Sequence, residues 1–367
     1  MKDALLVAVL RDPGRVRTFL PAQWELLLRQ AVRAGLHGTL PFLLDDAGLL
    51  DAAPAGPREQ LAWMRTGALR HRDGVLNEVR LIARALGELG QPLLLLKGAA
   101  YVMADLPMSR GRLFSDVDIL VPKEALRAAE SALMLHGWAS THHDDYDQRY
   151  YREWMHELPP LEHVRRGTAI DVHHAILPET AARRPDPALL RENSLPIPWP
   201  GGLAGDCPLS VLAPHDMVLH SAVHLFWDGE FDHGLRDLFD IHRLLLQFGA
   251  RPGFWEGLAA RSVALELDRP LFYALRYAAR LLDTPVPPEV SRALAGAAPN
   301  PVLLALMDAL FLRGLQPAHP SCGDAFSRTA RFLLYVRGNW LRMPPPLLAR
   351  HLFHKAFVSP RETAAPA

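Results

Sequence analysis

Two aspartates, Asp116 and Asp118, stand at the start of an apolar run that reads DVDILV. Because alternate residues of a β-strand point to the same face, both carboxylates would project into one site. Asp171 lies in a later alternating run, AIDVHHAIL, and would join the pair if the two strands are neighbours. Buried carboxylates need a compensating cation. Three carboxylates on adjacent strands suit Mg²⁺, and two such ions could activate a hydroxyl and stabilise a leaving pyrophosphate.

A plainer interpretation of the pair is that Asp116 ends a strand and Asp118 forms a salt bridge with an arginine. The surrounding sequence favours a metal site, because the pair heads an apolar strand, follows Ser115 and comes after a break at Lys97-Gly98. We therefore interpret the carboxylates as metal ligands.

Three cations precede the aspartates. Lys97 ends the apolar run QPLLLLKG, where a lysine needs an anion, and its partner would be a nucleotide phosphate or one of the aspartates. Arg110 and Arg112, in the segment SRGRLF, carry guanidinium groups that suit phosphate. The alternative for both arginines is a solvated loop side chain.

Two more polar residues flank the carboxylates. Ser115 could bind a phosphate or end a turn. His173 lies two residues after Asp171 and would face the same way in a regular strand. It could orient a general base, contact an acceptor, or serve as a hydrogen-bonded structural histidine.

The segment PHDMVLHSAVH offers a rival site. His220 and His224 share one face of a predicted helix, with His215 and Asp216 earlier, so this set could bind a transition metal and act as a phosphohydrolase. The simpler interpretation is that this helix packs against the sheet and lines the pocket.

Two later segments carry further charge. GLRDLFDIHRLL places Arg236, Asp237 and Asp240 on nearby helix faces, which predicts an internal Arg–Asp pair, with Arg236 in the nucleotide or acceptor site as the alternative. The basic and aromatic segment RFLLYVRGNWLRM is typical of an amphipathic closing helix, although it could contact nucleic acid.

Hydrophobic periodicity indicates helices on both sides of a short β-rich region. We predict an N-terminal helical region over residues 1–89, a core over 90–205, a C-terminal helical domain over 206–358 and a disordered tail over 359–367. Within the core, KEALRAAESALMLHGW is expected to be a helix. The predicted fold class is α+β, a small mixed sheet flanked by N-terminal helices and a C-terminal helical bundle.

Composition narrows the functional classes. The 367 residues are 49% hydrophobic, which is enough for real cores, and their formal net charge is zero, which disfavours a long nucleic acid as partner. The two cysteines form neither a disulfide framework nor a zinc motif, which fits a reducing compartment. No apolar run is long enough to span a bilayer, so we expect a cytoplasmic protein without a membrane partner.

The segments LLLLKGAAYVMADLP, SDVDILVP, HGW and AIDVHHAIL, in this order, resemble the uncharacterised nucleotidyltransferase family. This family belongs to the polymerase-beta-type nucleotidyltransferase superfamily, and its bacterial members are similar to distant relatives of aminoglycoside nucleotidyltransferases. The resemblance covers most of the chain. It implies that residues 90–205 form a nucleotidyltransferase core.

The resemblance also implies roles for individual residues. Gly98 matches the glycine of a Gly-Ser turn that holds the nucleotide triphosphate, but Ala99 stands where the superfamily has serine. Asp116 and Asp118 match the metal-binding pair. Asp171 matches the third carboxylate, which acts as or supports the general base.

The expected activity is transfer of a nucleoside monophosphate from an NTP such as ATP to a hydroxyl or similar acceptor, with release of pyrophosphate and with two Mg²⁺ ions. Around the donor we expect Lys97, Gly98, Arg110, Arg112, Ser115 and His173. A small molecule, peptide or protein is favoured as acceptor over long nucleic acid. The alternatives are a nucleotidyltransferase-fold binding or regulatory module without turnover, which Ala99 would permit, and a metal phosphohydrolase that uses His220 and His224.

Overall fold

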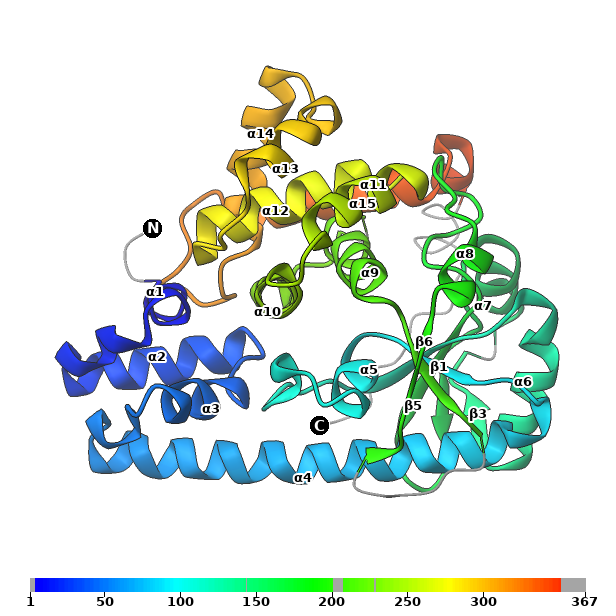
Figure 1. Ribbon diagram of the computed structural model, residues 1–367, viewed down its shortest axis with the longest axis horizontal. Helices are drawn as coiled ribbons and strands as arrows, with labels where there is room; N and C mark the ends of the chain where they lie inside the picture. The colour runs from blue at the N-terminus through cyan, green and yellow to red at the C-terminus, as the bar shows by residue number, and fades with distance from the viewer. Residues whose placement is uncertain (1–3, 143, 201–206, 228, 351–367) are drawn as a thin grey trace.

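A single mixed β-sheet with helices packed around it organises the protein (Figure 1). The computed structural model describes residues 4–142, 144–200, 207–227 and 229–350. Helices precede the sheet, interrupt it and follow it along the chain. The predicted α+β fold class is therefore confirmed.

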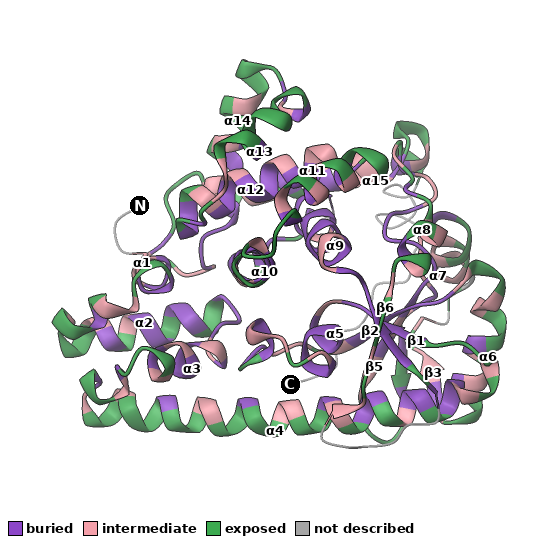
Figure 2. Ribbon diagram, viewed as in Figure 1, coloured by how far each residue is buried: buried purple, intermediate pink, exposed green. Residues whose placement is uncertain are grey.

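Of the N-terminal helices, the first three lie at the left of Figure 1 and the fourth runs along its lower edge. They are α1 (Leu5–Arg11), α2 (Pro21–Arg33), α3 (Thr39–Asp46) and the 32-residue α4 (Ala55–Leu86). The outer face of α4 is exposed along most of its length (Figure 2). Its buried side chains, which include Val75, Val79 and Ile82, belong to the same hydrophobic core as the sheet residues.

The sheet contains seven strands in the described residues, in the order β3-β4-β5-β2-β1-β7-β6. Two neighbouring pairs are parallel, β2 with β5 and β1 with β7, and the other pairs are antiparallel. The central strands are buried, since β1 and β7 expose none of their residues. The strands are β1 (Leu93–Leu95), β2 (Asp116–Leu120), β3 (Trp138–Ser140), β4 (Leu161–His163), β5 (Ala169–His173), β6 (Leu195–Ile197) and β7 (Leu209–Val211).

Short helices connect the strands. They are α5 (Lys97–Met103), α6 (Leu126–Leu135), α7 (Asp145–Arg149), which continues into a π-helix (Tyr150–Trp154), and α8 (Pro187–Glu192). Helix α5 packs on β2 and on α4 and lies between α4 and the C-terminal helices in Figure 1.

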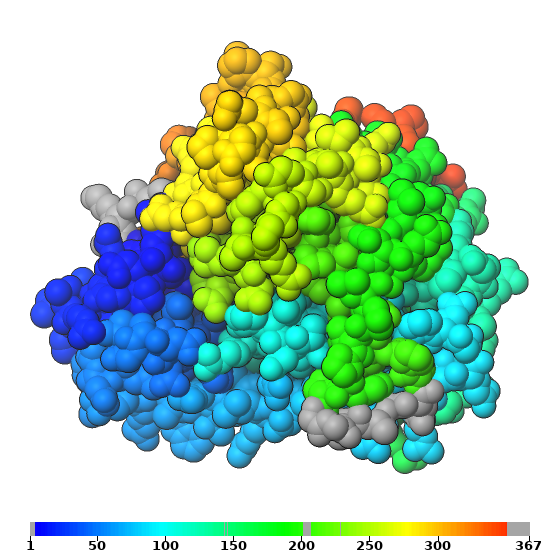
Figure 3. Space-filling model, viewed as in Figure 1, coloured from blue at the N-terminus to red at the C-terminus, as the bar shows by residue number. Residues whose placement is uncertain are grey.

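The C-terminal helices pack around α9, whose residues are almost all buried (Figure 2). Helices α10, α11, α12 and α15 contact α9, while α13 and α14 project from the upper edge in Figures 1 and 3. Their bounds are α9 (Pro214–Trp227), α10 (Gly234–Gly249), α11 (Phe254–Ala264), α12 (Asp268–Leu282), α13 (Pro288–Ala293), α14 (Pro301–Gly314) and α15 (Ser327–Arg342).

Some elements differ from the expectations. The helix expected to run to Trp138 ends at Leu135, because Gly137 adopts a left-handed φ of 97° and Trp138 begins β3. Strand β7 lies beyond residue 205, so the sheet extends past the expected end of the core, and the domain boundaries stay predictions. The expected tail, 359–367, lies outside the described residues. Within the described part, no helix has both the length and the apolar character needed to cross a membrane.

Candidate functional site

The sheet brings the three predicted carboxylates together. Strands β2 and β5 are parallel neighbours, and Asp118 lies directly opposite Asp171 in their register. Asp116 and Asp118 both line one cavity of about 430 Å³, so they share a face as the strand period predicts. Ligand atoms of Asp118, Asp171 and His173 lie within 4.8 Å of one another. This arrangement can hold a cation.

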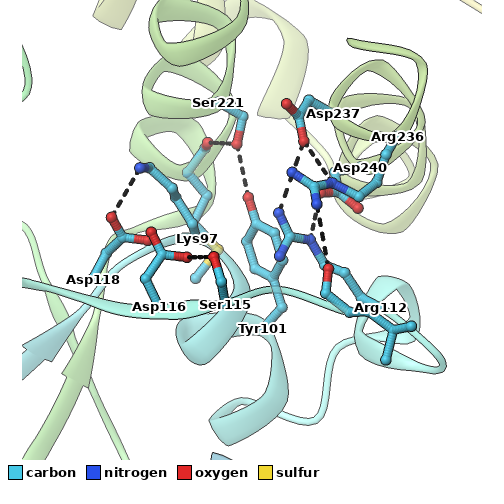
Figure 4. Close-up of polar contacts among 12 residues, drawn as sticks. Lys97, Tyr101, Arg112, Ser115, Asp116, Asp118, Ser221, Arg236, Asp237 and Asp240 are labelled. Atoms are coloured by element: carbon cyan, nitrogen blue, oxygen red, sulfur yellow. Dashed lines mark hydrogen bonds and ion pairs between the residues drawn. The ribbon is translucent and has the colours of Figure 1, made fainter. Parts of the chain in front are cut away.

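Asp118 is buried, and one of its carboxylate oxygens contacts both Lys97 and His173. Its Oδ1 accepts a hydrogen bond from Lys97 Nζ at 2.9 Å and lies 2.9 Å from His173 Nε2 (Figure 4 shows the lysine contact). Burial by itself would raise the pKa of Asp118, but Lys97 and His173 outweigh it and hold the pKa well below its usual range. The carboxylate is therefore ionised at neutral pH. Of the two partners considered for Lys97, the structure shows the aspartate.

Asp171 has the opposite electrostatic environment. Burial, followed by the negative charges of Asp118 and Glu157, raises the pKa of Asp171 to about 7. A carboxylate with such a pKa can take up a proton near neutral pH, which is the property that a general base requires.

His173 connects the carboxylates to a residue that the sequence did not indicate. Its Nδ1 lies 3.1 Å from Glu157 Oε2, and its ring stacks on His156. Burial would lower the pKa of His173, but Glu157 and Asp118 raise it above its ordinary value. Glu157 lies outside every regular strand and meets β5 through an isolated bridge, so no periodic signal could have identified it.

The turn at Lys97-Gly98 is conformationally demanding. Lys97 has a φ of 43°, a left-handed value that non-glycine residues adopt only when the surrounding structure enforces it. A side chain at position 98 would collide with the guanidinium of Arg112 and approach the Phe114 ring to within 2.7 Å. Glycine is therefore required at position 98 for the close approach of these two residues.

Arg112 lies between this turn and α10. It is 7% exposed, its Nε donates to Asp240 Oδ2 at 2.6 Å, and its guanidinium stands over the rings of Tyr101 and Phe114 (Figure 4). The side chain also lines the cavity. Arg112 is thus a fixed cation at the cavity wall, whereas the sequence allowed a solvated loop residue.

Arg236 forms the predicted internal ion pair and also lines the cavity, so both interpretations of this residue apply. Its Nε donates to Asp237 Oδ1 at 2.9 Å, which is the predicted internal pair, and its side chain lines the same cavity as the carboxylates (Figure 4). Asp240, which its spacing also offered to Arg236, is bonded instead to Arg112.

Arg110 and Ser115 are placed differently from each other. Ser115 lines the cavity, and its Oγ donates to Asp116 Oδ1 at 3.2 Å. Arg110 is not among the lining residues, and it forms an ion pair with Asp46 at 2.7 Å and stacks over Phe42. The structure brings Ser115 to the carboxylates but does not bring Arg110.

The histidines of α9 serve the pocket rather than a separate cluster. His220 is buried, and burial followed by the charge of Lys97 holds its pKa well below the usual value. His224 lines the cavity. Among the described residues, the groups of three possible metal ligands are Asp118–Asp171–His173 and His156–Glu157–His173, and neither includes an α9 histidine. Helix α9 therefore packs and lines the pocket, as the simpler interpretation expected.

Three lining residues come from segments with no recognisable motif. His37 follows α2, Val32 lies near the end of α2, and His233 precedes α10. Their side chains line the same cavity as Asp116 and Asp118. No spacing rule in the sequence connects these positions to the strands, which is why the sequence did not reveal them.

The profile of a family described as uncharacterised nucleotidyltransferases matches residues 21–283 of the chain. The chain belongs to this family. Among solved structures, it is similar to MenT4, a nucleotidyltransferase toxin from Mycobacterium tuberculosis H37Rv, with 16% sequence identity over 74% of this chain and 98% of that chain and a TM-score of 0.30. No curated protein matches the chain.

The range matched by the nucleotidyltransferase family contains all three aspartates and the Lys97-Gly98 turn. It ends at the C-terminal boundary of α12. Helices α13, α14 and α15 therefore lie outside the matched range.

Proposed function

We propose that this nucleotidyltransferase moves a nucleoside monophosphate from an NTP to a hydroxyl acceptor and releases pyrophosphate. The observation that supports the proposal most directly is the register of β2 and β5, which places Asp171 opposite Asp118 on the side that Asp116 also faces. Such a carboxylate set matches the oxygen ligands that Mg²⁺ prefers.

The oxygen atoms of the three aspartates are ligands that suit a magnesium site. Asp116, Asp118 and Asp171 would hold two Mg²⁺ ions, which would neutralise the triphosphate and favour ionisation of the acceptor hydroxyl. Asp116 is only half-buried and forms no salt bridge among the described residues, so its carboxylate is available to a ligand in the cavity.

The cations of the cavity would bind and orient the triphosphate. Arg112 and Arg236 are held by carboxylates on α10 and keep further N–H groups for phosphate oxygens. Lys97 would exchange its bond with Asp118 for one with a phosphate when the nucleotide binds. Ala99 is buried and offers no hydroxyl, so in this protein the three cations take over the contacts that a serine would make.

In the proposed reaction, the acceptor oxygen attacks the α-phosphorus, the bond from that phosphorus to the bridging oxygen of the β-phosphate breaks, and pyrophosphate leaves. Asp171 accepts the proton of the acceptor hydroxyl. The position of Asp171 opposite Asp118 supports this role, because it puts the carboxylate beside the proposed metal ligands. We propose a small molecule, peptide or protein as acceptor rather than long nucleic acid.

The proposal is tested by thermal shift with each NTP, with and without Mg²⁺. At a ligand concentration of about 100 times its Kd, the unfolding free energy should rise by roughly 2.7 kcal/mol. We expect a Mg²⁺-dependent shift in the wild type that is lost in Asp118→Asn and in Asp116→Asn. Asp45→Asn, which removes a carboxylate from an ion pair with Arg65 outside the cavity, should keep the shift.

Each outcome has a distinct meaning. Absence of a shift with every NTP would contradict a nucleotide site. A shift that persists in both cavity variants would show that these carboxylates are not the metal ligands. A Mg²⁺-dependent shift without pyrophosphate formation, even with acceptors supplied by a cell extract, would favour a binding module without turnover. The absence of a hydroxyl at Ala99 is consistent with such a module.

A further inference from the structure

A second cavity, of about 600 Å³, lies where α12, α14 and α15 meet. It shares no lining residue with the cavity beside Asp118. Its volume falls within the range of about 300–1,000 Å³ that is usual for small-molecule sites. Helices α14 and α15 lie outside the range matched by the family profile, whereas Trp227, Arg269 and Tyr273 lie inside it.

The walls of this cavity are apolar. Leucine and methionine side chains from α14 and α15 line it together with the rings of Trp227, Tyr273 and Trp340. Several of these side chains remain partly open to solvent, as Leu306 and Trp340 are 49% and 59% exposed. A ligand with a hydrocarbon portion would cover this surface and gain free energy from its burial.

Cations without carboxylate partners stand in the same cavity. Arg269 and Arg337 both line it, and neither forms a salt bridge within the described part of the chain. Arg337 instead donates from Nη1 to the carbonyl oxygen of Phe226 at 2.7 Å and stands over the ring of Tyr273. Burial lowers the pKa of Arg337, Tyr273 offsets part of this effect, and the positive charge of Arg269 makes a smaller contribution in the same direction as burial. Such charges are costly to bury without an anion.

Two buried N–H groups at this cavity also have no acceptor. Trp227 is 5% exposed, and its Nε1 has no hydrogen-bond partner among the described residues. The same is true of Arg269 Nε. Buried donors are normally satisfied, so the indole N–H of Trp227 together with the cations Arg269 and Arg337 points to an acceptor that carries negative charge.

Other arginines near Arg269 and Arg337 do have carboxylate partners. On the same helix α12, Arg276 and Arg280 both form salt bridges with Asp308 at 2.6 Å, and at the cavity rim Arg183 is paired with Asp268. The fold therefore provides carboxylates for arginines nearby, and leaves Arg269 and Arg337 without them.

We propose that this cavity binds a single-chain amphiphile with a carboxylate head, of the fatty-acid type. The carboxylate would accept hydrogen bonds from Arg269 and from Trp227 Nε1 and would lie in the field of Arg337. The hydrocarbon chain would cover the leucine-rich wall. A peptide fits less well, because its backbone would add N–H donors, whereas the arginine and tryptophan side chains that line the cavity can only donate.

Isothermal titration of the full-length protein with decanoate tests the proposal, with decanol and decyltrimethylammonium as probes of the same chain length. We expect binding of decanoate at least about 10-fold tighter than that of either probe, since a charge-assisted hydrogen bond discriminates by that factor or more. Arg269→Gln and Trp227→Phe should weaken decanoate binding and leave decanol binding unchanged. Arg276→Gln is the matched control on α12, and it should retain wild-type affinity.

Equal affinity for decanoate and decanol would overturn the proposal, because it would show that only the apolar wall matters. Equal losses in Arg269→Gln and Arg276→Gln would overturn it as well, since general positive charge would then explain the binding. Sedimentation with phosphatidylglycerol vesicles provides a further arm. Binding to vesicles without binding of monomeric decanoate would assign the arginines to an anionic membrane surface instead. Circular dichroism and the Tm confirm that each variant is folded.

Discussion

The cavity beside Asp118 and the cavity beside Arg337 are both lined by arginines, but they differ in where the opposite charge is placed. In the first, Arg112 and Arg236 are bonded to aspartates of α10, and Asp116 and Asp118 add further negative charge. In the second, the protein supplies no carboxylate to Arg269 or Arg337 within the described residues. A salt-bridged arginine is fixed and oriented, whereas an uncompensated one is a binding group that awaits an anion.

This difference has a thermodynamic consequence. Removing a cation from the first cavity leaves a buried carboxylate without its partner, which lowers the unfolding free energy. Removing Arg269 from the second cavity leaves no carboxylate of the described residues without its partner. Stability measurements can therefore distinguish the two kinds of site without any ligand.

The largest expected effect follows from Arg112→Gln. Asp240 is 5% exposed and would lose a hydrogen bond of 2.6 Å, so the unfolding free energy should fall by roughly 3–5 kcal/mol. Urea unfolding followed by circular dichroism measures the change. The double variant Arg112→Met with Asp240→Leu is the control, and it should recover part of the loss because it leaves no unpaired charge. A loss below about 1 kcal/mol for the single variant would show that Asp240 is satisfied in another way.

An intermediate effect on the unfolding free energy is expected from pH, through the ion pairs that Asp308 of α14 forms with Arg276 and Arg280 of α12. Hydrogen bonds from Arg276, Arg280 and Tyr277 lower the pKa of Asp308 to about 2, despite partial burial. The folded protein therefore binds this proton less readily than the unfolded chain. The stabilisation is complete above pH 4, and it is lost as the pH falls towards 2.

Urea midpoints between pH 3 and pH 6 measure this contribution. Wild type should exceed Asp308→Asn in stability at pH 6, and the gap should narrow as the pH approaches 3. A stability difference that stays constant over this pH range would mean that the charge of Asp308 does not stabilise the packing of α12 on α14.

The smallest effect is expected from Arg269→Gln. Because Arg269 has no carboxylate to leave behind, the unfolding free energy should change by less than about 0.5 kcal/mol, or rise slightly as repulsion with Arg337 is relieved. The same urea titration measures it. A fall in the unfolding free energy of about 2 kcal/mol or more would show that Arg269 takes part in a structural ion pair. The two cavities would then not differ in the way described above.

Local rules were sufficient to predict the centre of the site. The two-residue period of a strand places Asp116 and Asp118 on one face, and the apolar run around Asp171 indicates a further strand, which the structure places beside the first. The helices before and after the sheet followed from their hydrophobic periodicity, and the family assignment confirms the resemblance drawn from the segments around Lys97 and the aspartates. The metal-binding and catalytic roles of these residues stay predictions.

Long-range pairing could not be predicted. Arg112 meets Asp240 across two unrelated segments, and Glu157 reaches His173 from an irregular stretch, so neither contact has a spacing in the sequence. Strand β7 spans only Leu209–Val211, which is too short for alternation to show. Its identity as a strand comes from its pairing with β1 and not from any propensity of its own.

The parallel pairing of β1 with β7 also determines when the site can be completed during synthesis. Leu93 pairs with Leu209, so the strand that leads into the Lys97 turn gains its second neighbour only after the ribosome has passed Val211. A nascent chain that ends earlier already contains all three aspartates, yet lacks the strand that holds β1 from its other side. Closing such a long loop is entropically slow. We therefore expect the enzyme to become competent late in translation, after its N-terminal helices have left the exit tunnel.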